Sequence, residues 1–284
     1  MSPDGTRVAL TIRDQDHDIH IVDLTGPSLR RLSFSPTVET SPVWFPDGHR
    51  IIFASYSGDG NAAILFAQSA DGGGPVERLT TSQHSQIPWF VTPDGTRIVG
   101  YTNGDIVGFP MRSAVAQPGH RSEPDAVSSQ VERIVHTAFS ELNAEISPDG
   151  RYIAYQSDES GRHEVYVRPF PGVDKGRREV SSGSGTRPAW ARNGQELFYL
   201  DPANKLMAVP GQRSAATFAL GNPALVLNTA YAGSIDFASR TYDVSPDGQR
   251  FLMIKDNVSG APKPPGMVVV LNWFEELKQR VPVQ

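Results

Sequence analysis

The sequence contains no cysteine, so it offers no disulfide, no thiolate metal site and no cysteine nucleophile. It also lacks any block of Lys and Arg interleaved with aromatic residues, and its formal net charge is −5. Nucleic acid and an anionic membrane surface are therefore not expected as partners. No apolar run approaches the roughly 18 residues that cross a bilayer, and the N-terminus does not resemble a signal peptide. These absences predict a soluble chain without a transmembrane segment.

One four-residue phrase, in contrast, recurs six times. Five copies end in Pro-Asp-Gly and one ends in Arg-Asn-Gly; they occupy residues 2–5, 45–48, 92–95, 147–150, 191–194 and 245–248. Pro presets the backbone for a reversal, Asp or Asn bonds the backbone two residues on, and Gly accepts a positive φ, so each copy predicts a hairpin turn. The spacing of 43 to 55 residues between copies suits four short strands, which is the period of a propeller blade.

Runs of β-forming residues follow each turn, as at residues 50–54 and 152–155. The predicted fold is all-β: a six-bladed β-propeller of four-stranded antiparallel blades, forming a single domain over residues 1–284. The expected blades cover roughly residues 1–37, 38–83, 84–138, 139–183, 184–237 and 238–273. Trp44 and Trp190 recur at one position before the turns, so we expect both in the core between blades.

The two ends of the repeat are irregular. The first turn lacks a strand before it, and only one further strand, at residues 267–271, follows the last hairpin. Blades one and six are therefore expected to be incomplete, the chain to be a piece of a larger protein, and the open edges to be able to pair with another copy. Asn272 and Glu275 resemble a capping box, which predicts a short C-terminal helix over 273–280.

Several segments carry a resemblance to a known family, in the order residues 157–172, 196–200, 205–209, 242–245, 249–252 and 268–273. Together with the turns, they make the chain resemble TolB-like propellers, and within these the C-terminal sensor region of bacterial receptor-type Ser/Thr protein kinases. The resemblance implies a six-bladed propeller in an extracytoplasmic or periplasmic place, C-terminal to a kinase domain and a membrane helix. The chain has neither a Gly-rich loop with its Lys nor a His-Arg-Asp loop, so it is not itself a kinase.

Polar residues recur near the start of the innermost strand of each blade, and these are the candidate binding residues: Glu39, Gln86, Glu141, Asn143, Glu145, Arg187, Arg240 and Tyr242. Because such strand starts meet at one mouth of a propeller channel, the side chains are expected to converge there. The arginines could hold an anion or a peptide, and the carboxylates could hold a cation. Equally, the set could be structural, with charges that compensate one another among water molecules.

Two motifs that suggest other chemistry are incomplete. Asp14, Asp16 and Asp18 alternate as at the start of a calcium loop, but Ile19 and Thr25 stand where Gly and Glu are required, which favours a solvated turn. Residues 183–185, Gly-Ser-Gly, lack the outer glycine spacing of a hydrolase nucleophile elbow. No cofactor is therefore expected, although a Ca²⁺ ion in the channel stays open.

The sequence favours a non-enzymatic propeller that binds a ligand or protein as the sensing part of a larger signalling protein. Its partner would be a protein, a peptide or a glycan at the pore face. The alternative is a propeller hydrolase of the lactonase or esterase type, which would use a metal in the central channel. A purely structural scaffold is a third possibility.

Overall fold

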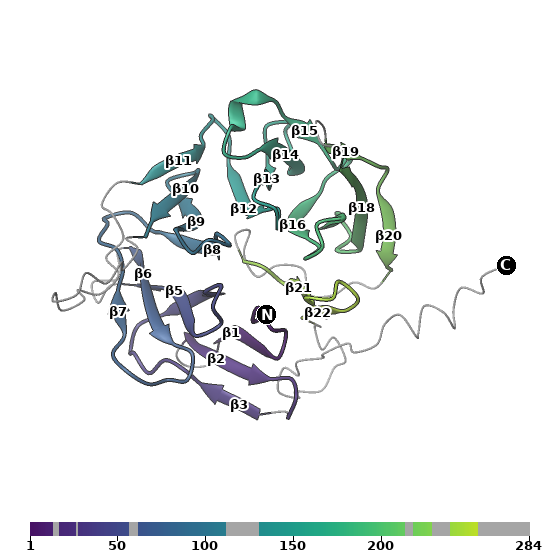
Figure 1. Ribbon diagram of the computed structural model, residues 1–284. Coiled ribbons are helices and arrows are strands. Elements are labelled where there is room, and N and C mark those ends of the chain that lie inside the picture. Colours follow the sequence, from purple (N-terminus) through teal and green to yellow (C-terminus); the bar gives the residue numbers. More distant parts are fainter. Residues whose placement is uncertain are drawn as a thin grey trace. The chain divides into compact units, whose positions relative to one another are not determined.

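The computed structural model describes residues 1–13, 17–26, 28–56, 62–111, 131–213, 218–228 and 239–254 (Figure 1). The chain divides into two compact units, residues 1–144 and 145–284, which are considered one at a time. The described residues form antiparallel β-sheets and one short 3-10 helix, η1 (Val173–Lys175). The prediction of an all-β fold made of small antiparallel sheets is confirmed.

The first unit contains three sheets. The first sheet has the order β1 (Arg7–Arg13), β2 (His17–Asp23), β3 (Ser28–Arg31). The second has the order β4 (Glu39–Trp44), β5 (Arg50–Tyr56), β6 (Ala63–Ser69), β7 (Glu77–Arg78). The third runs through β8 (Ile87–Val91), β9 (Arg97–Thr102), β10 (Asp105–Pro110) and β11 (Glu132–Val135). Strands that follow one another in sequence pair side by side, as expected for propeller blades.

The division between the units falls inside β12, so the sheet that starts there is described with the second unit. It consists of β12 (Glu141–Ile146), β13 (Tyr152–Ser157), β14 (Glu164–Pro169) and β15 (Arg178–Glu179). The next sheet has five strands: β16 (Thr186–Trp190), β17 (Glu196–Leu200), β18 (Leu206–Arg213), β19 (Phe218–Leu220) and β20 (Ala224–Leu227). The last has two strands, β21 (Tyr242–Val244) and β22 (Phe251–Met253).

The prediction of six blades is wrong for the part of the chain that is described, which shows five blades and the two-stranded hairpin β21–β22. The periodic turns predicted a blade at every copy, but a turn specifies only the two strands that it joins. The strands that complete a blade need their own pairing partners. The predicted strand at 267–271 and the predicted helix at 273–280 lie outside the described residues.

The core of each unit lies between neighbouring sheets. Trp44 of β4 packs with Ile19 and Ile21 of β2, and in the second unit Trp190 of β16 packs with Val165 and Val167 of β14. Both indoles are buried. The prediction that these two tryptophans join one sheet to the next is confirmed, and burial of such large apolar surfaces is what holds consecutive blades together.

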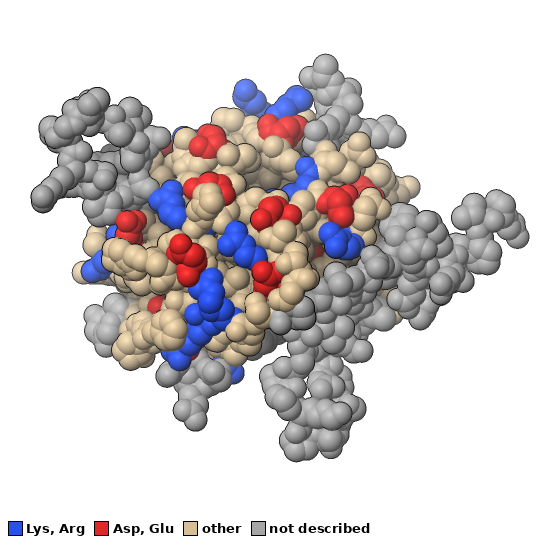
Figure 2. All heavy atoms as spheres, turned by 60° about the horizontal axis from the view of Figure 1, so that its bottom comes forward, with Lys and Arg blue, Asp and Glu red and all other residues tan. Residues whose placement is uncertain are grey.

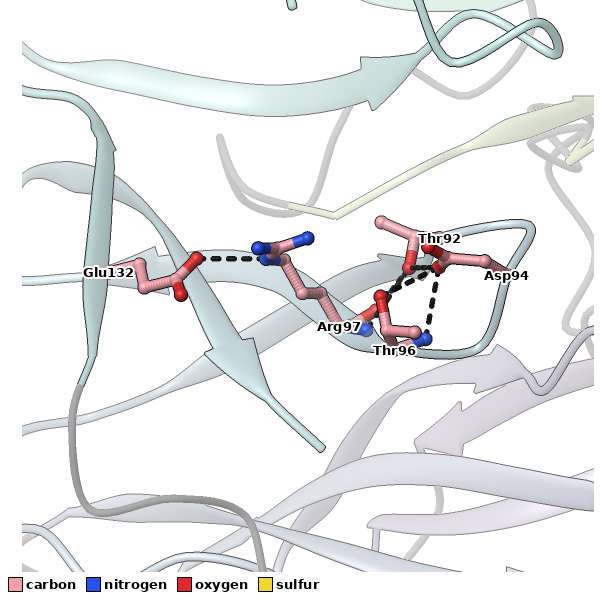
Figure 3. A network of polar contacts seen from close by, with 5 residues as sticks. All are labelled: Thr92, Asp94, Thr96, Arg97 and Glu132. Atoms are coloured by element: carbon pink, nitrogen blue, oxygen red, sulfur yellow. Dashed lines mark hydrogen bonds and ion pairs between the residues drawn. The ribbon is translucent and has the colours of Figure 1, made fainter. Parts of the chain in front are cut away.

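The recurrent turns close as their residue types predict. In all six, the Asp or Asn side chain accepts a hydrogen bond from the backbone amide two residues on, and the Gly has φ between 63° and 72°. Figure 3 shows the third turn, where Asp94 Oδ1 also accepts from the hydroxyls of Thr92, at 2.6 Å, and Thr96, at 2.8 Å. The hydrogen bond from Thr92 is the main reason that the pKa of Asp94 lies below its ordinary value. The hydroxyl residue that opens most copies of the phrase therefore locks the Asp in place.

Candidate functional site

The residues that begin or precede the innermost strands in the first unit are buried. Glu39 is the first residue of β4, Gln86 directly precedes β8 and Glu141 is the first residue of β12; their exposed fractions are 3%, 3% and 1%. All three stand eight residues before the Asp of the following turn. All three side chains are therefore shielded from solvent.

A hydroxyl group anchors the loop before each of these residues. Ser33 Oγ accepts from the amide of Ile19 at 2.9 Å, and Thr80 Oγ1 accepts from the amide of Leu65 at 3.0 Å. The Thr80 hydroxyl then donates to Gln86 Oε1 at 2.5 Å. Ser33 bonds the Glu39 carboxyl in the same way. Glu39 and Gln86, as acceptors of these hydroxyl bonds, thus fix the loops that join one sheet to the next.

A hydroxyl group also bonds Glu141, but this one is held within its own loop, where Thr137 Oγ1 accepts from the amide of Phe139 at 3.1 Å. The Thr137 hydroxyl donates to Glu141 Oε1, and the Glu141 amide donates to the carbonyl of Gly104 at 3.3 Å. Asn143, two residues further along β12, has a left-handed backbone with φ 54°, as have Ser41 (φ 55°) and Arg187 (φ 53°). Each of these three stands six residues before the Asp or Asn of its turn. Non-glycine residues adopt this conformation at a cost, and the bend re-aims the inner strand at one point in each of these blades.

The electrostatic environment of Glu39 favours its protonated form. Burial raises the pKa of Glu39 from 4.5 to about 7; the nearby Asp18 carboxylate adds to the rise, whereas the bond from Ser33 and the charge of Arg31 oppose it. Asp18 is itself buried and pairs with Arg31, whose Nη2 lies 2.7 Å from Asp18 Oδ2. Two buried carboxyl groups thus face one guanidinium.

In the second unit, Glu145 forms an ion pair with Arg240, which lies 95 residues further along the sequence. Arg240 Nη2 donates to Glu145 Oε2 at 2.9 Å, and the amide of Trp190 donates to the same oxygen at 3.2 Å. Asp243 Oδ1 lies 3.8 Å from Arg240 Nη1. Burial alone would lower the pKa of Arg240, but the Glu145 and Asp243 carboxylates raise it above its ordinary value.

Arg187 and Tyr242 form a second contact between β16 and the β21 region. Tyr242 Oη donates to the Arg187 carbonyl at 2.7 Å, and Arg187 Nε donates to the carbonyl of Ser239 at 2.9 Å. The Arg187 amide donates to Gln156 Oε1 at 2.9 Å. Burial raises the pKa of Tyr242, so it stays a neutral donor. These two candidates tie strands together, and they do so with their side chains buried.

The sequence analysis missed a further cluster, Asp105 with His136 and Arg133. His136 Nδ1 lies 2.7 Å from Asp105 Oδ1, and Arg133 Nε lies 3.7 Å from Asp105 Oδ2. His136 follows the buried aliphatic residue that ends an outer strand, which is the position of Ser33, Thr80 and Ser181 in other blades. Alignment of this position across the repeats would have found it.

Exposed apolar side chains lie on the loops above the buried polar residues of the first unit. Phe34 is 74% exposed and Val38 40% exposed, both between β3 and β4, and Phe139 is 46% exposed between β11 and β12. The Arg31 guanidinium lies 5.0 Å from the centre of the Phe34 ring. Since blades of one topology place equivalent loops at the same end, these side chains belong to one end of the first unit.

Within the described ranges, no group of three or more His, Asp and Glu side chains is placed to hold a metal ion. Asp14 and Asp16 of the candidate calcium loop lie outside those ranges. Nor does any helix in the described part of the chain have the length and apolarity to cross a membrane.

Comparison with known proteins identifies the fold. Residues 1–116 match the family model described as the TolB beta propeller domain. The structure resembles TolB from Acinetobacter baumannii, with 18% identity and a TM-score of 0.61, over 90% of this chain and 59% of that one. It also resembles a putative TolB from Agrobacterium tumefaciens, with 16% identity and a TM-score of 0.58, over 79% and 77% of the two chains.

An oligogalacturonate lyase in complex with manganese is similar too, with 13% identity and a TM-score of 0.55, over 92% of this chain and 71% of that one. At these identities the likenesses show the fold alone, a β-propeller of the TolB type. The chain spans 59% of the length of the Acinetobacter TolB.

Proposed function

We propose that this chain is a non-enzymatic binding module that recognises a protein segment at the loop end of its first unit. The observation that carries the proposal is the exposure of Phe34, Val38 and Phe139 on loops that lead into inner strands. Aromatic side chains are enriched in protein interfaces, and exposed ones on loops fixed by a rigid scaffold are suited to recognition. The occupant would be a peptide or a protein loop with an apolar anchor.

The buried polar residues give these loops their rigidity. Ser33 and Glu39 hold the loop that carries Phe34, and Thr137 and Glu141 hold the loop that carries Phe139. A loop fixed in advance loses less conformational entropy when a partner binds. Glu39 and Glu141 therefore position the binding surface, whereas the exposed apolar side chains contact the partner.

On the face shown in Figure 2, the acidic and basic side chains are interspersed, without a large field of one sign. At the proposed surface, apolar contacts of Phe34, Val38 and Phe139 would supply most of the affinity. The resemblance to receptor-kinase sensor regions supports a role for the module as the sensing part of a larger bacterial signalling protein, outside the membrane.

We expect Phe34→Ser to weaken partner binding about tenfold or more, because an exposed aromatic anchor contributes at least about 1.4 kcal/mol to such an interface. A random peptide library displayed on phage and selected on the purified chain would supply the probe. Titration calorimetry of the selected peptide would compare the variants. The matched control is Leu225→Ser, which removes an exposed apolar side chain from β20 in the second unit.

Equal affinity of the selected peptides for the wild type, Phe34→Ser and Phe139→Ser would contradict the proposed surface. Binding of glycans on an array, without selection of any peptide from the phage library, would also contradict the proposed surface. Turnover of an ester or lactone that a chelator abolishes, and that Glu39→Ala abolishes as well, would contradict the non-enzymatic function itself.

A further inference from the structure

Asp18 of β2 and Glu39 of β4 are two buried carboxyl groups on strands that pack against each other. Their exposed fractions are 1% and 3%. Within the described residues, Asp18 Oδ1 and Glu39 Oε2 have no hydrogen-bond donor. A buried oxygen without a donor is costly, and more so when it is charged. The two oxygens therefore need a hydrogen-bond donor, which an ionised carboxylate does not supply.

The next blade has the same framework without either acid. The amide of Leu65 bonds Thr80, as the amide of Ile19 bonds Ser33, and Gln86 stands in the place of Glu39. The residue before Leu65 is Ile64, which occupies the place of Asp18. Since the neutral version builds the same loop, the two carboxyl groups of the first blade are not required for the architecture.

A second comparison shows what a buried glutamate needs in order to stay charged. Glu164 in the second unit is fully buried, and it accepts from Ser181 Oγ at 2.5 Å, Arg162 Nε at 2.7 Å, Ser184 N at 2.9 Å and Gly183 N at 3.0 Å. Burial would raise its pKa, but these donors bring the pKa below the ordinary value. Glu39 has the burial, but among the described residues its carboxyl group has the Ser33 hydroxyl as its one donor. The two glutamates should therefore differ in protonation.

We propose that Asp18 and Glu39 form a proton-binding site in which one proton lies between Glu39 Oε2 and Asp18 Oδ1. The bound proton gives each of the two oxygens a hydrogen-bond partner and leaves one negative charge, which the Arg31 guanidinium balances. Loss of the proton leaves two buried negative charges beside a single arginine. The site thus takes up a proton in mild acid and releases it in mild alkali.

The other charged groups on the elements packed against β4 do not replace Arg31. β8 carries none, and Arg50 of β5 and Arg7 of β1 stand at the ends of their strands nearest the turns, away from Glu39. Arg13, at the other end of β1, is exposed and therefore well screened by solvent. The remaining charged or titratable residues of β2 are His17, His20 and Asp23, of which His20 is buried with Nδ1 3.3 Å from the Asp18 carbonyl.

The pH dependence follows from the direction of the shift. Burial raises the pKa of Glu39 from 4.5 to about 7, so between these values the folded chain holds a proton that the unfolded chain has lost. Stability from this site is complete below 4.5 and is lost as the pH rises toward 7. Because Ser33 and Glu39 hold the loop that carries Phe34, release of the proton should loosen that loop.

The test is the melting temperature of the wild type, Glu39→Gln and Asp18→Asn between about pH 5 and about pH 8. We expect the wild type to lose several degrees relative to Glu39→Gln over this range, because glutamine supplies the neutral form at every pH, as Gln86 does in the next blade. Glu179→Gln, on exposed β15, is the matched control and should follow the wild type. A melting curve of Glu39→Gln that parallels the wild type at every pH would overturn the proposal.

A direct readout separates the proton from other occupants. The carboxyl carbon signals of isotope-labelled glutamate should include one that titrates near neutrality, is absent from Glu39→Gln and moves to lower pH in Asp18→Asn, since the Asp18 charge contributes to the raised pKa. If added Ca²⁺ restores the melting temperature of the wild type in alkali but leaves Glu39→Gln unchanged, the site holds a metal ion and the proton proposal is wrong.

Discussion

Truncation of Trp190 to alanine should destabilise the chain by about 3 to 5 kcal/mol, the range measured when a large buried aromatic side chain is removed. Trp190 is 3% exposed and packs against Ala154, Val165 and Val180 of the neighbouring sheet as well as Leu197 of its own. Its Nε1 donates to the carbonyl of Glu145 at 3.1 Å. The substitution therefore leaves a cavity between two sheets and a carbonyl without its donor.

Urea unfolding followed by circular dichroism would measure this loss. Trp190→Phe keeps most of the packing and removes only the hydrogen bond, so it should cost about 1 to 2 kcal/mol. Phe34→Ala removes an exposed ring and should change the free energy of unfolding by less than about 0.5 kcal/mol. A cost below about 1 kcal/mol for Trp190→Ala would show that the interface between these sheets relaxes around the gap, contrary to a packed core.

Glu145→Ala should cost about 2 to 3 kcal/mol. The carboxylate accepts from both Arg240 and the amide of Trp190, so its removal leaves a buried donor and a guanidinium without their acceptor. The expected cost is below that of a fully buried pair because the Arg240 side chain is 32% exposed and Asp243 lies 3.8 Å away as a second acceptor. Glu145→Gln keeps the shape and one acceptor, and should cost less.

The control for this ion pair is Glu132→Ala. Arg97 Nε lies 2.8 Å from Glu132 Oε2, but the two side chains are 39% and 47% exposed, so this pair should contribute at most about 1 kcal/mol (Figure 3). The free energies of unfolding of Glu145→Ala, Arg240→Met and the double variant form a cycle whose coupling energy isolates the pair. Equal losses for Glu145→Ala and Glu132→Ala would mean that burial of the Glu145 pair carries no weight.

The candidate residues illustrate how far the repeat could predict a site. Its regular spacing pointed to Glu39, Gln86 and Glu141 as candidates, because the equivalent position in each blade is a fixed distance from the turn; their role in binding stays a prediction. The spacing did not predict that all three would be buried under the loops, since burial depends on the neighbouring sheet. Asp105 and His136 were not predicted because their contact joins residues 31 positions apart, and neither residue belongs to the recurrent four-residue phrase.

The sequence by itself determined the turns, the strands that flank them and the two tryptophans of the core. These features depend on local preferences: the Asp side chain bonds the backbone two residues away, and Gly accepts the positive φ that the reversal requires. Only the tertiary structure decided how many complete blades form and which charges meet. Packed sheets bring strands that are distant in sequence into contact, so Glu145 pairs with Arg240 and Asp18 lies near Glu39. Such contacts are decisive because water cannot stabilise an unpaired charge in the interior.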